Sequence, residues 1–272
     1  MTQLPETNMP EHSPYQGLAS GYDRARPAYP DEALALLPVR DGDLVADIGA
    51  GTGIFSRQMA RTFPAARIIG VEPGSDMRRR AEDASRHLRN LSFVTGAAEA
   101  LPLPADRFAL VTAATAAHWF DRPRFYPEAF RCLAPGRMLA IVQNKRRWWD
   151  SAFLAAYEDL HEETVPGYLR GTFPAGDGGY APIDAAAELA QRHEAADVHE
   201  HSIPWTQITT RPDFVTFSLS SSITQKAVKR LGEPAYLARL EHLIERYADA
   251  SGQLGVPYVT TVVTAVKAGL PA

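Results

Sequence analysis

The sequence contains a single cysteine, Cys132, among its 272 residues. One cysteine can form neither a disulfide within the chain nor a cysteine-based zinc site. No apolar run approaches the roughly 18 residues of a membrane-spanning helix. Residues 1–14 are polar and lack the apolar centre of a secretory signal. We therefore expect a cytoplasmic protein with a flexible tail over residues 1–14 and no membrane partner.

Basic residues are not concentrated anywhere in the chain. The formal net charge is -4, and a basic run such as the three arginines at 78–80 is short. Nucleic-acid binders draw much of their affinity from neutralising phosphates, so we expect no nucleic-acid partner. The eight histidines include no helix-spaced pair with a carboxylate, and no metal site is expected. The sequence does not indicate whether the protein is a monomer or a homo-oligomer.

Segments typical of strands and helices alternate from residue 44 to residue 143. The expected strands are 44–48, 67–71, 91–95, 108–114 and 137–143, and the expected helices are 31–39, 53–63, 75–88 and 122–133. This order predicts an α/β fold in which a mostly parallel, doubly wound, Rossmann-like sheet carries helices on both faces. We assign residues 15–145 to this core.

The second half of the sequence has a different pattern. Residues 146–197 contain helical fragments and a glycine-rich loop, and we interpret them as a helical cap or lid inserted after the fifth strand. Residues 198–208 alternate like a strand, 234–247 form an amphipathic helix, and 257–269 are rich in β-branched residues. The part from 198 to 272 is thus expected to complete a seven-stranded sheet and the substrate pocket.

Three glycines alternate in DIGAGTG, residues 47–53, where the first strand turns into a helix. Such a turn leaves helix N–H groups free and lets a ligand approach closely, which suits a nucleotide or nucleoside. The dinucleotide pattern G-x-G-x-x-G fails, because its sixth position counted from Gly49 is Ile54, and no Gly-Lys-Ser/Thr ending indicates a P-loop. Asp47 would repel a pyrophosphate and would suit an amino group or a cationic centre.

A second acidic residue ends the next strand. Glu72 follows IIGV at 68–71, a place where a carboxylate can accept both hydroxyls of a ribose. The alternative interpretation is a solvated acid at a strand end. Together with Asp47, Glu72 favours a nucleoside ligand that carries a positive charge.

With these residues in place, the chain resembles the class I S-adenosylmethionine-dependent methyltransferases over most of residues 15–145. The resemblance rests on DIGAGTG at 47–53, VEPGSDM at 71–77 and GAAEALPLPADRFALVTAATAAHWF at 96–120. It implies S-adenosylmethionine as the methyl donor and S-adenosylhomocysteine as a product. The N-terminal GYDRARPAYP at 21–30 is also similar to a subgroup of small-molecule methyltransferases.

The resemblance also implies a role for individual residues. The implied donor-binding residues are Tyr22 and Arg26 at the methionine end, Asp47, Gly49, Ala50, Gly51 and Gly53 in the loop, Glu72 on the ribose, Pro73 and Met77 beside the adenine, Ala97, Ala98 and Glu99 at its edge, and Ala114 near the methyl group. Many members of the family have Asp at the position of Ala97, so we assign that adenine contact to backbone groups or to Glu99. Tyr22 and Arg26 could instead belong to a segment that packs on the sheet.

Methyl transfer from a sulfonium needs a nucleophile held in line with the methyl carbon and shielded from water. His118 could take a proton from the acceptor or position it, or it could be a structural histidine. The expected substrate residues are Tyr15, Trp119, Phe120, Trp148 and Trp149, although such aromatic residues could equally belong to the core. These aromatic residues favour nitrogen or carbon of a small indole-like natural product as the methylated atom. O-methylation of a carboxylic acid or phenol remains an alternative, because Arg146, Arg147 and Arg170 in the cap segment could bind a carboxylate, although they could also be solvated. A protein that binds the nucleoside without methyl transfer is a further alternative.

Overall fold

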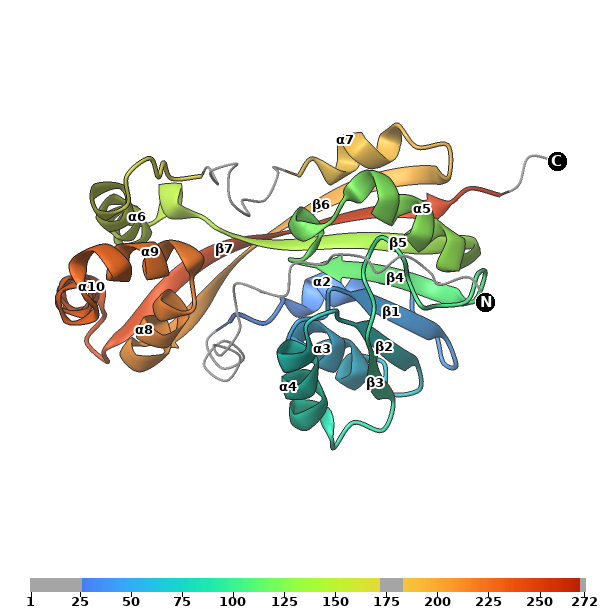
Figure 1. Ribbon diagram of the computed structural model, residues 1–272, viewed down its shortest axis with the longest axis horizontal. Helices are drawn as coiled ribbons and strands as arrows, with labels where there is room; N and C mark the ends of the chain where they lie inside the picture. Colours follow the sequence, from blue (N-terminus) through green and yellow to red (C-terminus); the bar gives the residue numbers. More distant parts are fainter. Residues whose placement is uncertain (1–25, 172–182, 270–272) are drawn as a thin grey trace, which may run out of the picture.

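A seven-stranded sheet organises the molecule, and the computed structural model describes residues 26–171 and 183–269 of the chain. Its strands are β1 (Leu44–Ile48), β2 (Arg67–Val71), β3 (Leu91–Val94), β4 (Phe108–Ala114), β5 (Leu133–Arg146), β6 (Ala195–Thr210) and β7 (Gln253–Lys267). Their order across the sheet is β3-β2-β1-β4-β5-β7-β6. The first five pair in parallel, whereas β7 is antiparallel to both β5 and β6 (Figure 1). The expected mostly parallel, seven-stranded α/β sheet is confirmed.

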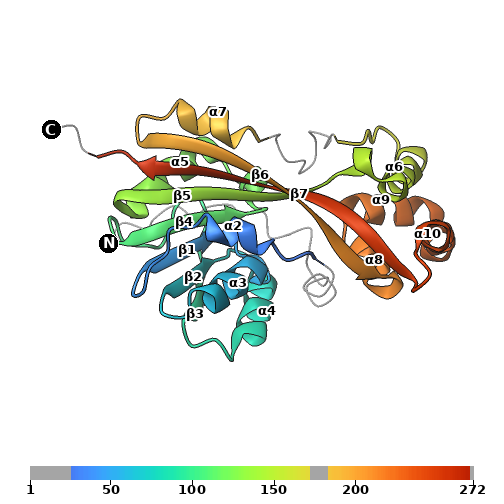
Figure 2. The same cartoon turned by 180° about the vertical axis from the view of Figure 1, so that it is seen from behind.

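Helices cover both faces of the sheet, as the two opposite views show (Figures 1 and 2). The helices in these layers are α2 (Asp31–Ala35), α3 (Ile54–Thr62) and α4 (Ser75–Ser85) on one face, and α5 (Arg122–Cys132) and α7 (Ala185–Ala190) on the other. The central strands are buried on both sides, and β4 is therefore an almost continuous apolar run. Because β1 pairs in parallel with both β2 and β4, the carboxyl ends of these three strands lie at the same edge of the sheet.

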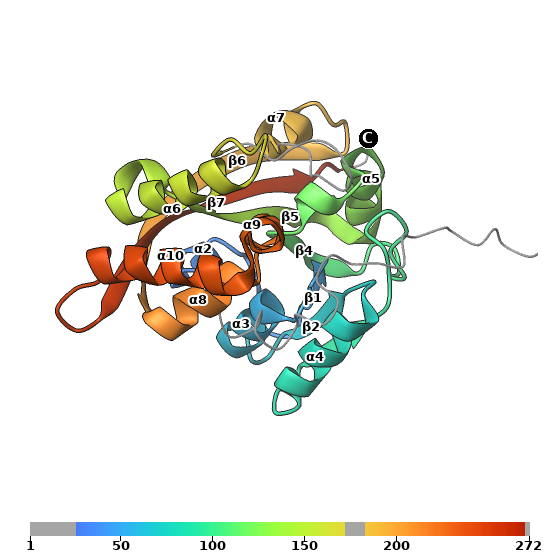
Figure 3. The same ribbon diagram turned by 60° about the vertical axis from the view of Figure 1, so that its left-hand side comes forward.

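A second group of helices lies at the far end of the three longest strands (Figure 3). We call α6 (Ala152–Thr164), α8 (Arg211–Leu219), α9 (Ser222–Leu231) and α10 (Glu233–Tyr247) the helical layer. They share a hydrophobic cluster of their own with the first part of β7 and Trp205 of β6, and Tyr157 and Tyr236 are fully buried in it. None of the described helices is long and apolar enough to cross a membrane.

The helical layer differs from the cap that was expected over residues 146–197. Only α6 of that segment belongs to the layer, whereas α7 packs on the main core through Ala185 and Leu189. The other three helices come from beyond residue 210, and α8 and α9 were not expected from the sequence. The division of the chain into core, cap and C-terminal part stays a prediction, and the expected tail over residues 1–14 lies outside the described residues.

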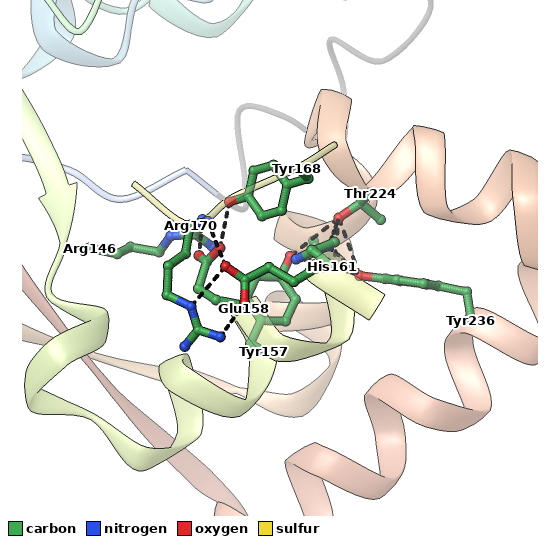
Figure 4. A network of polar contacts seen from close by, with 10 residues as sticks. Arg146, Tyr157, Glu158, His161, Tyr168, Arg170, Thr224 and Tyr236 are labelled. Atoms are coloured by element: carbon green, nitrogen blue, oxygen red, sulfur yellow. Dashed lines mark hydrogen bonds and ion pairs between the residues drawn. The ribbon is translucent and has the colours of Figure 1, made fainter. Parts of the chain in front are cut away.

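Inside the helical layer a buried polar network joins the helices (Figure 4). The ring nitrogen Nε2 of His161 lies 3.0 Å from the Thr224 hydroxyl and 3.2 Å from the Tyr236 hydroxyl. The hydroxyl of Tyr157 in turn lies 2.8 Å from that of Ser218. Burial and the Arg146 guanidinium lower the pKa of His161 to about 4, so the network holds a neutral imidazole at neutral pH.

Candidate active site

The loop between β1 and α3 has its three glycines in the left-handed region, with φ of 67° at Gly49, 56° at Gly51 and 80° at Gly53. A Cβ on Gly49 would lie 2.7 Å from Cβ of Ala116, and one on Gly53 would lie 2.8 Å from the ring of Phe93. A Cβ on Gly51 would meet no atom within 4 Å. The outer two glycines are therefore required by packing, and Gly51 alone faces open space, where a ligand can approach the backbone.

Glu72 lies beside the open side of this loop, at the end of β2. One carboxylate oxygen accepts the N–H of Gly51 at 2.9 Å, and the other accepts the N–H of Gly74 at 2.8 Å. Burial raises the pKa of Glu72, whereas these two hydrogen bonds and the Arg78 guanidinium oppose the rise. The carboxylate is thus held rigidly between the loop and the start of α4.

Asp47 lies below the glycine loop, at the end of β1. It is buried, and its two oxygens accept hydrogen bonds from Ser56 at 2.5 Å and Thr112 at 3.0 Å. Burial raises the pKa of Asp47 to about 6, although both hydroxyls lower it. Asp47 is only 1% exposed, against 9% for Glu72, so it offers less surface to a ligand, and its contact with the donor stays a prediction. Asp47 ties β1 to α3 and β4.

The other expected donor-binding residues lie around the same edge of the sheet. Pro73 is exposed and Met77 is buried at the start of α4, and Ala114 is the last residue of β4. The carboxylate of Glu99 accepts the N–H of Asp121 at 2.8 Å, so it is partly engaged in holding the segment before α5. Their contacts with a donor, like those of Ala50, Ala97 and Ala98, stay predictions, and Tyr22 lies outside the described residues.

His118 follows β4 in a short 3-10 helix, η1 (Ala117–Trp119). Burial and the guanidinium groups of Arg26 and Arg122 lower the pKa of His118 to about 4. At neutral pH the imidazole is therefore uncharged and can accept a proton or a hydrogen bond. The electrostatic effect of Arg26 places its guanidinium in the neighbourhood of His118.

The aromatic residues expected to surround the substrate do not form one wall. Phe120 packs on Gly49 and on Phe125, with a ring separation of 4.9 Å, and so supports the glycine loop. Trp119 and Trp149 are 42% and 57% exposed. Phe120 is thus part of the packing below the loop, whereas Trp119 and Trp149 are exposed to solvent. Trp148 lies in η2 (Trp148–Asp150), where it contacts Trp149 and the guanidinium of Arg170, and Tyr15 lies outside the described residues.

A chain of polar contacts that the sequence analysis missed leads across the sheet from the end of β4. The hydroxyl of Tyr29 lies 2.8 Å from that of Thr115, which also accepts the backbone N–H of Asn144 at 3.4 Å. The Asn144 amide oxygen accepts the hydroxyl of Thr260 at 2.6 Å, and this hydroxyl accepts the indole N–H of Trp205 at 2.8 Å. The only sequence signal for it is the alternation of polar residues in the two strands. These contacts join the end of β4 to β5, β7 and β6 on one face of the sheet.

The structure also contains a pocket away from the predicted residues. It is lined by β5, β6, β7 and the start of α7, with Lys145, Asp184 and Glu200 among its polar groups. It lies on the opposite face of the sheet from the polar chain through Asn144 and Thr260. None of the residues predicted from the sequence lines it.

Comparison with known proteins gives consistent matches. A family model described as "Methyltransferase domain" matches residues 45–136. An uncharacterized methyltransferase of Mycobacterium tuberculosis is 30% identical over 254 residues, which cover 91% of this chain and 93% of that protein. A trans-aconitate 2-methyltransferase of Deinococcus radiodurans is 30% identical over 176 residues, 64% of this chain and 66% of the relative.

The fold of this chain is similar to that of solved methyltransferase structures. The crystal structure of a putative type II methyltransferase from Anaeromyxobacter dehalogenans superposes with a TM-score of 0.56 at 21% identity, and the match covers 91% of this chain and 99% of that one. The near full-length relative, the family model and the loop geometry point the same way. The chain belongs to the class I S-adenosylmethionine-dependent methyltransferases.

Proposed function

We propose that the protein binds S-adenosylmethionine along the Gly49–Gly53 loop and transfers its methyl group to a small organic acceptor. The observation that carries the proposal is the juxtaposition of Gly51 and Glu72: an open stretch of backbone lies directly beside a fixed carboxylate. A nucleoside needs both features, because its sugar lies against the backbone and its hydroxyls need an acceptor.

The donor fits the residues present. A carboxylate has about four lone-pair positions, and Glu72 uses one on each oxygen for Gly51 and Gly74. The remaining positions can accept the two ribose hydroxyls. On this basis we assign the adenine to the region of Pro73, Met77, Ala97, Ala98 and Glu99, and the methionine end to the region of Ala50, Ala114 and Arg26.

The protein's contribution to the chemistry is orientation and removal of a proton. S-adenosylmethionine supplies a methyl group whose bond to the sulfonium sulfur breaks as the bond to the acceptor forms, with the electron pair remaining on sulfur. An acceptor that arrives as a hydroxyl must lose its proton, and the neutral imidazole of His118 can take it. A carboxylate acceptor arrives ionised and needs only alignment.

The names of the relatives favour oxygen as the methylated atom. One relative is named for trans-aconitate, and a protein of Saccharopolyspora erythraea that is 33% identical over 126 residues is named erythromycin 3''-O-methyltransferase. We therefore propose a carboxylate or hydroxyl acceptor ahead of the indole-like nitrogen or carbon expected from the sequence. The scattered positions of Trp119, Trp148 and Trp149 agree with this choice.

The test is a transfer assay with methyl-labelled S-adenosylmethionine against carboxylic acids, sugars, phenols and indoles. We expect label in an oxygen acceptor and one S-adenosylhomocysteine per methylated product. Label in indoles alone would refute the oxygen proposal and leave methyl transfer standing. Donor binding without S-adenosylhomocysteine formation for any acceptor would support binding without transfer.

A further inference from the structure

Arg146 is the last residue of β5 and lies beneath the helical layer (Figure 4). Its guanidinium donates to Oε1 of Glu158 at 3.2 Å. The guanidinium carbon lies 5.3 Å from the ring centre of Tyr157 and 5.4 Å from that of Phe217. Two aromatic faces and one carboxylate thus hold the charge in a single orientation.

The hydrogen bonds of this arginine are incomplete. Its Nη1 is buried and has no hydrogen-bond partner among residues 26–171 and 183–269. The other oxygen of Glu158, Oε2, accepts the hydroxyl of Tyr168 at 2.5 Å and makes no hydrogen bond to Nη1. A buried cationic donor without an acceptor is costly, and an incoming anion would relieve that cost.

A second guanidinium adds to the positive charge. The guanidinium carbon of Arg26 lies 5.5 Å from the ring centre of Phe217, the ring that Arg146 also contacts. The Arg26 guanidinium is also close enough to His118 to lower the pKa of that imidazole. The two guanidinium groups beside Phe217 are accompanied by one carboxylate, that of Glu158, which pairs with Arg146. These three groups together carry a net positive charge.

Arg146 lies on the same face of β5 as Asn144. We call the end of β4, with Ala114 and His118, the methyl-transfer region, because the donor methyl group is expected there. Residues two apart on a strand share a face, so Arg146 follows Asn144, whose backbone N–H bonds to Thr115. The strand register places Ala114, the end of β4, opposite Val142. Arg146 is four residues further along β5, about 13 Å at the usual rise per residue.

We propose that Arg146 binds a carboxylate group of the acceptor through Nη1, with Arg26 contributing charge. This inference rests on the proposed function and narrows it. Arg146 lies about 13 Å along β5 from the residue opposite the end of β4, which is too far for the carboxylate at Arg146 to be methylated there. This carboxylate therefore serves to bind the acceptor, and the methylated atom belongs to a different group nearer to His118. The acceptor is therefore an elongated molecule with an anionic end, such as a dicarboxylic or hydroxy acid.

The test is calorimetric titration of trans-aconitate, succinate and the neutral succinamide onto the protein, with and without S-adenosylhomocysteine. We expect at least one carboxylate to bind and the amide not to bind. Arg146→Gln should weaken carboxylate binding at least tenfold, and Arg146→Lys, which keeps the charge, should recover part of the loss. The matched control is Arg170→Gln, which removes an arginine of the same region whose guanidinium is already paired with Asp159 and Glu162.

A purely structural role of Arg146 predicts another pattern. Arg146→Gln would then lower the melting temperature and leave the preference for carboxylate over amide unchanged, which would overturn the proposal. Equal binding of succinate and succinamide by the wild-type protein, or binding of none of the carboxylates, would also overturn it. Absence of S-adenosylhomocysteine binding would instead contradict the proposed function, and the titrations without it would still test Arg146.

Discussion

The backbone N–H of Gly51 lies 2.9 Å from Oε2 of Glu72, so the open point of the glycine loop and the acid at the end of β2 form one unit. The loop and the acid are 21 residues apart in sequence. They meet because β1 and β2 are parallel neighbours that pair Ile48 with Val71. The carboxylate therefore holds the loop at the point where the proposed function places the donor ribose.

Glu72→Ala is expected to weaken binding of S-adenosylmethionine by about 1.5–3 kcal/mol, since hydrogen bonds to a charged acceptor are lost. Calorimetric titration measures the effect. Asp76→Asn is the control, because Asp76 is an acid of the adjacent helix that pairs with Arg79 on the surface. An unchanged affinity of the Ala variant would remove Glu72 from the donor site.

Gly51→Ala and Gly42→Ala form a matched pair. Both glycines have positive φ, 56° and 82°, and a Cβ on either meets no atom within 4 Å. Each substitution should therefore cost about 1–2 kcal/mol of stability from backbone strain alone. Only Gly51→Ala should also weaken donor binding, because only Gly51 lies on the open side of the ligand loop. Equal donor affinities in the two variants, measured by calorimetry, would contradict the placement of the donor.

The sequence predicted the core of the fold well because the buried parallel strands leave a strong local signal. The bounds of β1, β2 and β4 agree with the expected 44–48, 67–71 and 108–114. In contrast, α8 was missed, since its sequence RPDFVTFSL mixes β-branched and aromatic residues that favour strands as much as helices. Its helical form depends on burial of Phe214 and Phe217 against distant segments.

The same contrast holds for the site. Gly51 and Glu72 were each predicted from motifs as donor-binding residues, and the fold places them 2.9 Å apart, while their contact with a donor stays a prediction. The burial of Asp47 could not be predicted, because it depends on hydroxyls from α3 and β4 that meet only in the fold. From the sequence, Arg146 could not be told from a solvated arginine, because its contacts with Tyr157, Glu158 and Phe217 of the helical layer form only in the fold.

His118→Gln tests the role of the neutral imidazole. If His118 removes a proton from a hydroxyl acceptor, kcat should fall about 10²–10⁴-fold with such an acceptor. A carboxylate acceptor is already ionised, so its kcat should change little, and donor affinity should be unchanged in both cases. Because the pKa is about 4, the wild-type rate with a hydroxyl acceptor should be flat near pH 6.5 and fall toward pH 4. Equal rates of the two proteins with hydroxyl acceptors would assign His118 a structural role.

Asp47 makes the stability of the fold depend on pH. Its pKa is about 6 in the folded protein against an ordinary value of 3.8, so between these values the folded state binds the proton more tightly than the unfolded state. Stability from this group is therefore greatest at low pH and falls as pH rises from about 4 to 6, by about 3 kcal/mol for a two-unit shift.

Asp47→Asn should remove that dependence. The amide oxygen can accept from one hydroxyl while the NH₂ donates to the other, and the Thr112 hydroxyl can still donate to the carbonyl of Ala46 at 3.3 Å. The variant should match the wild type near pH 4 and be more stable at pH 8 by about 1–3 kcal/mol. Urea unfolding at the two pH values measures both differences. A variant that is less stable than the wild type at pH 8 would mean that the charged form of Asp47 stabilises the loop, and that its hydrogen bonds outweigh the cost of its burial.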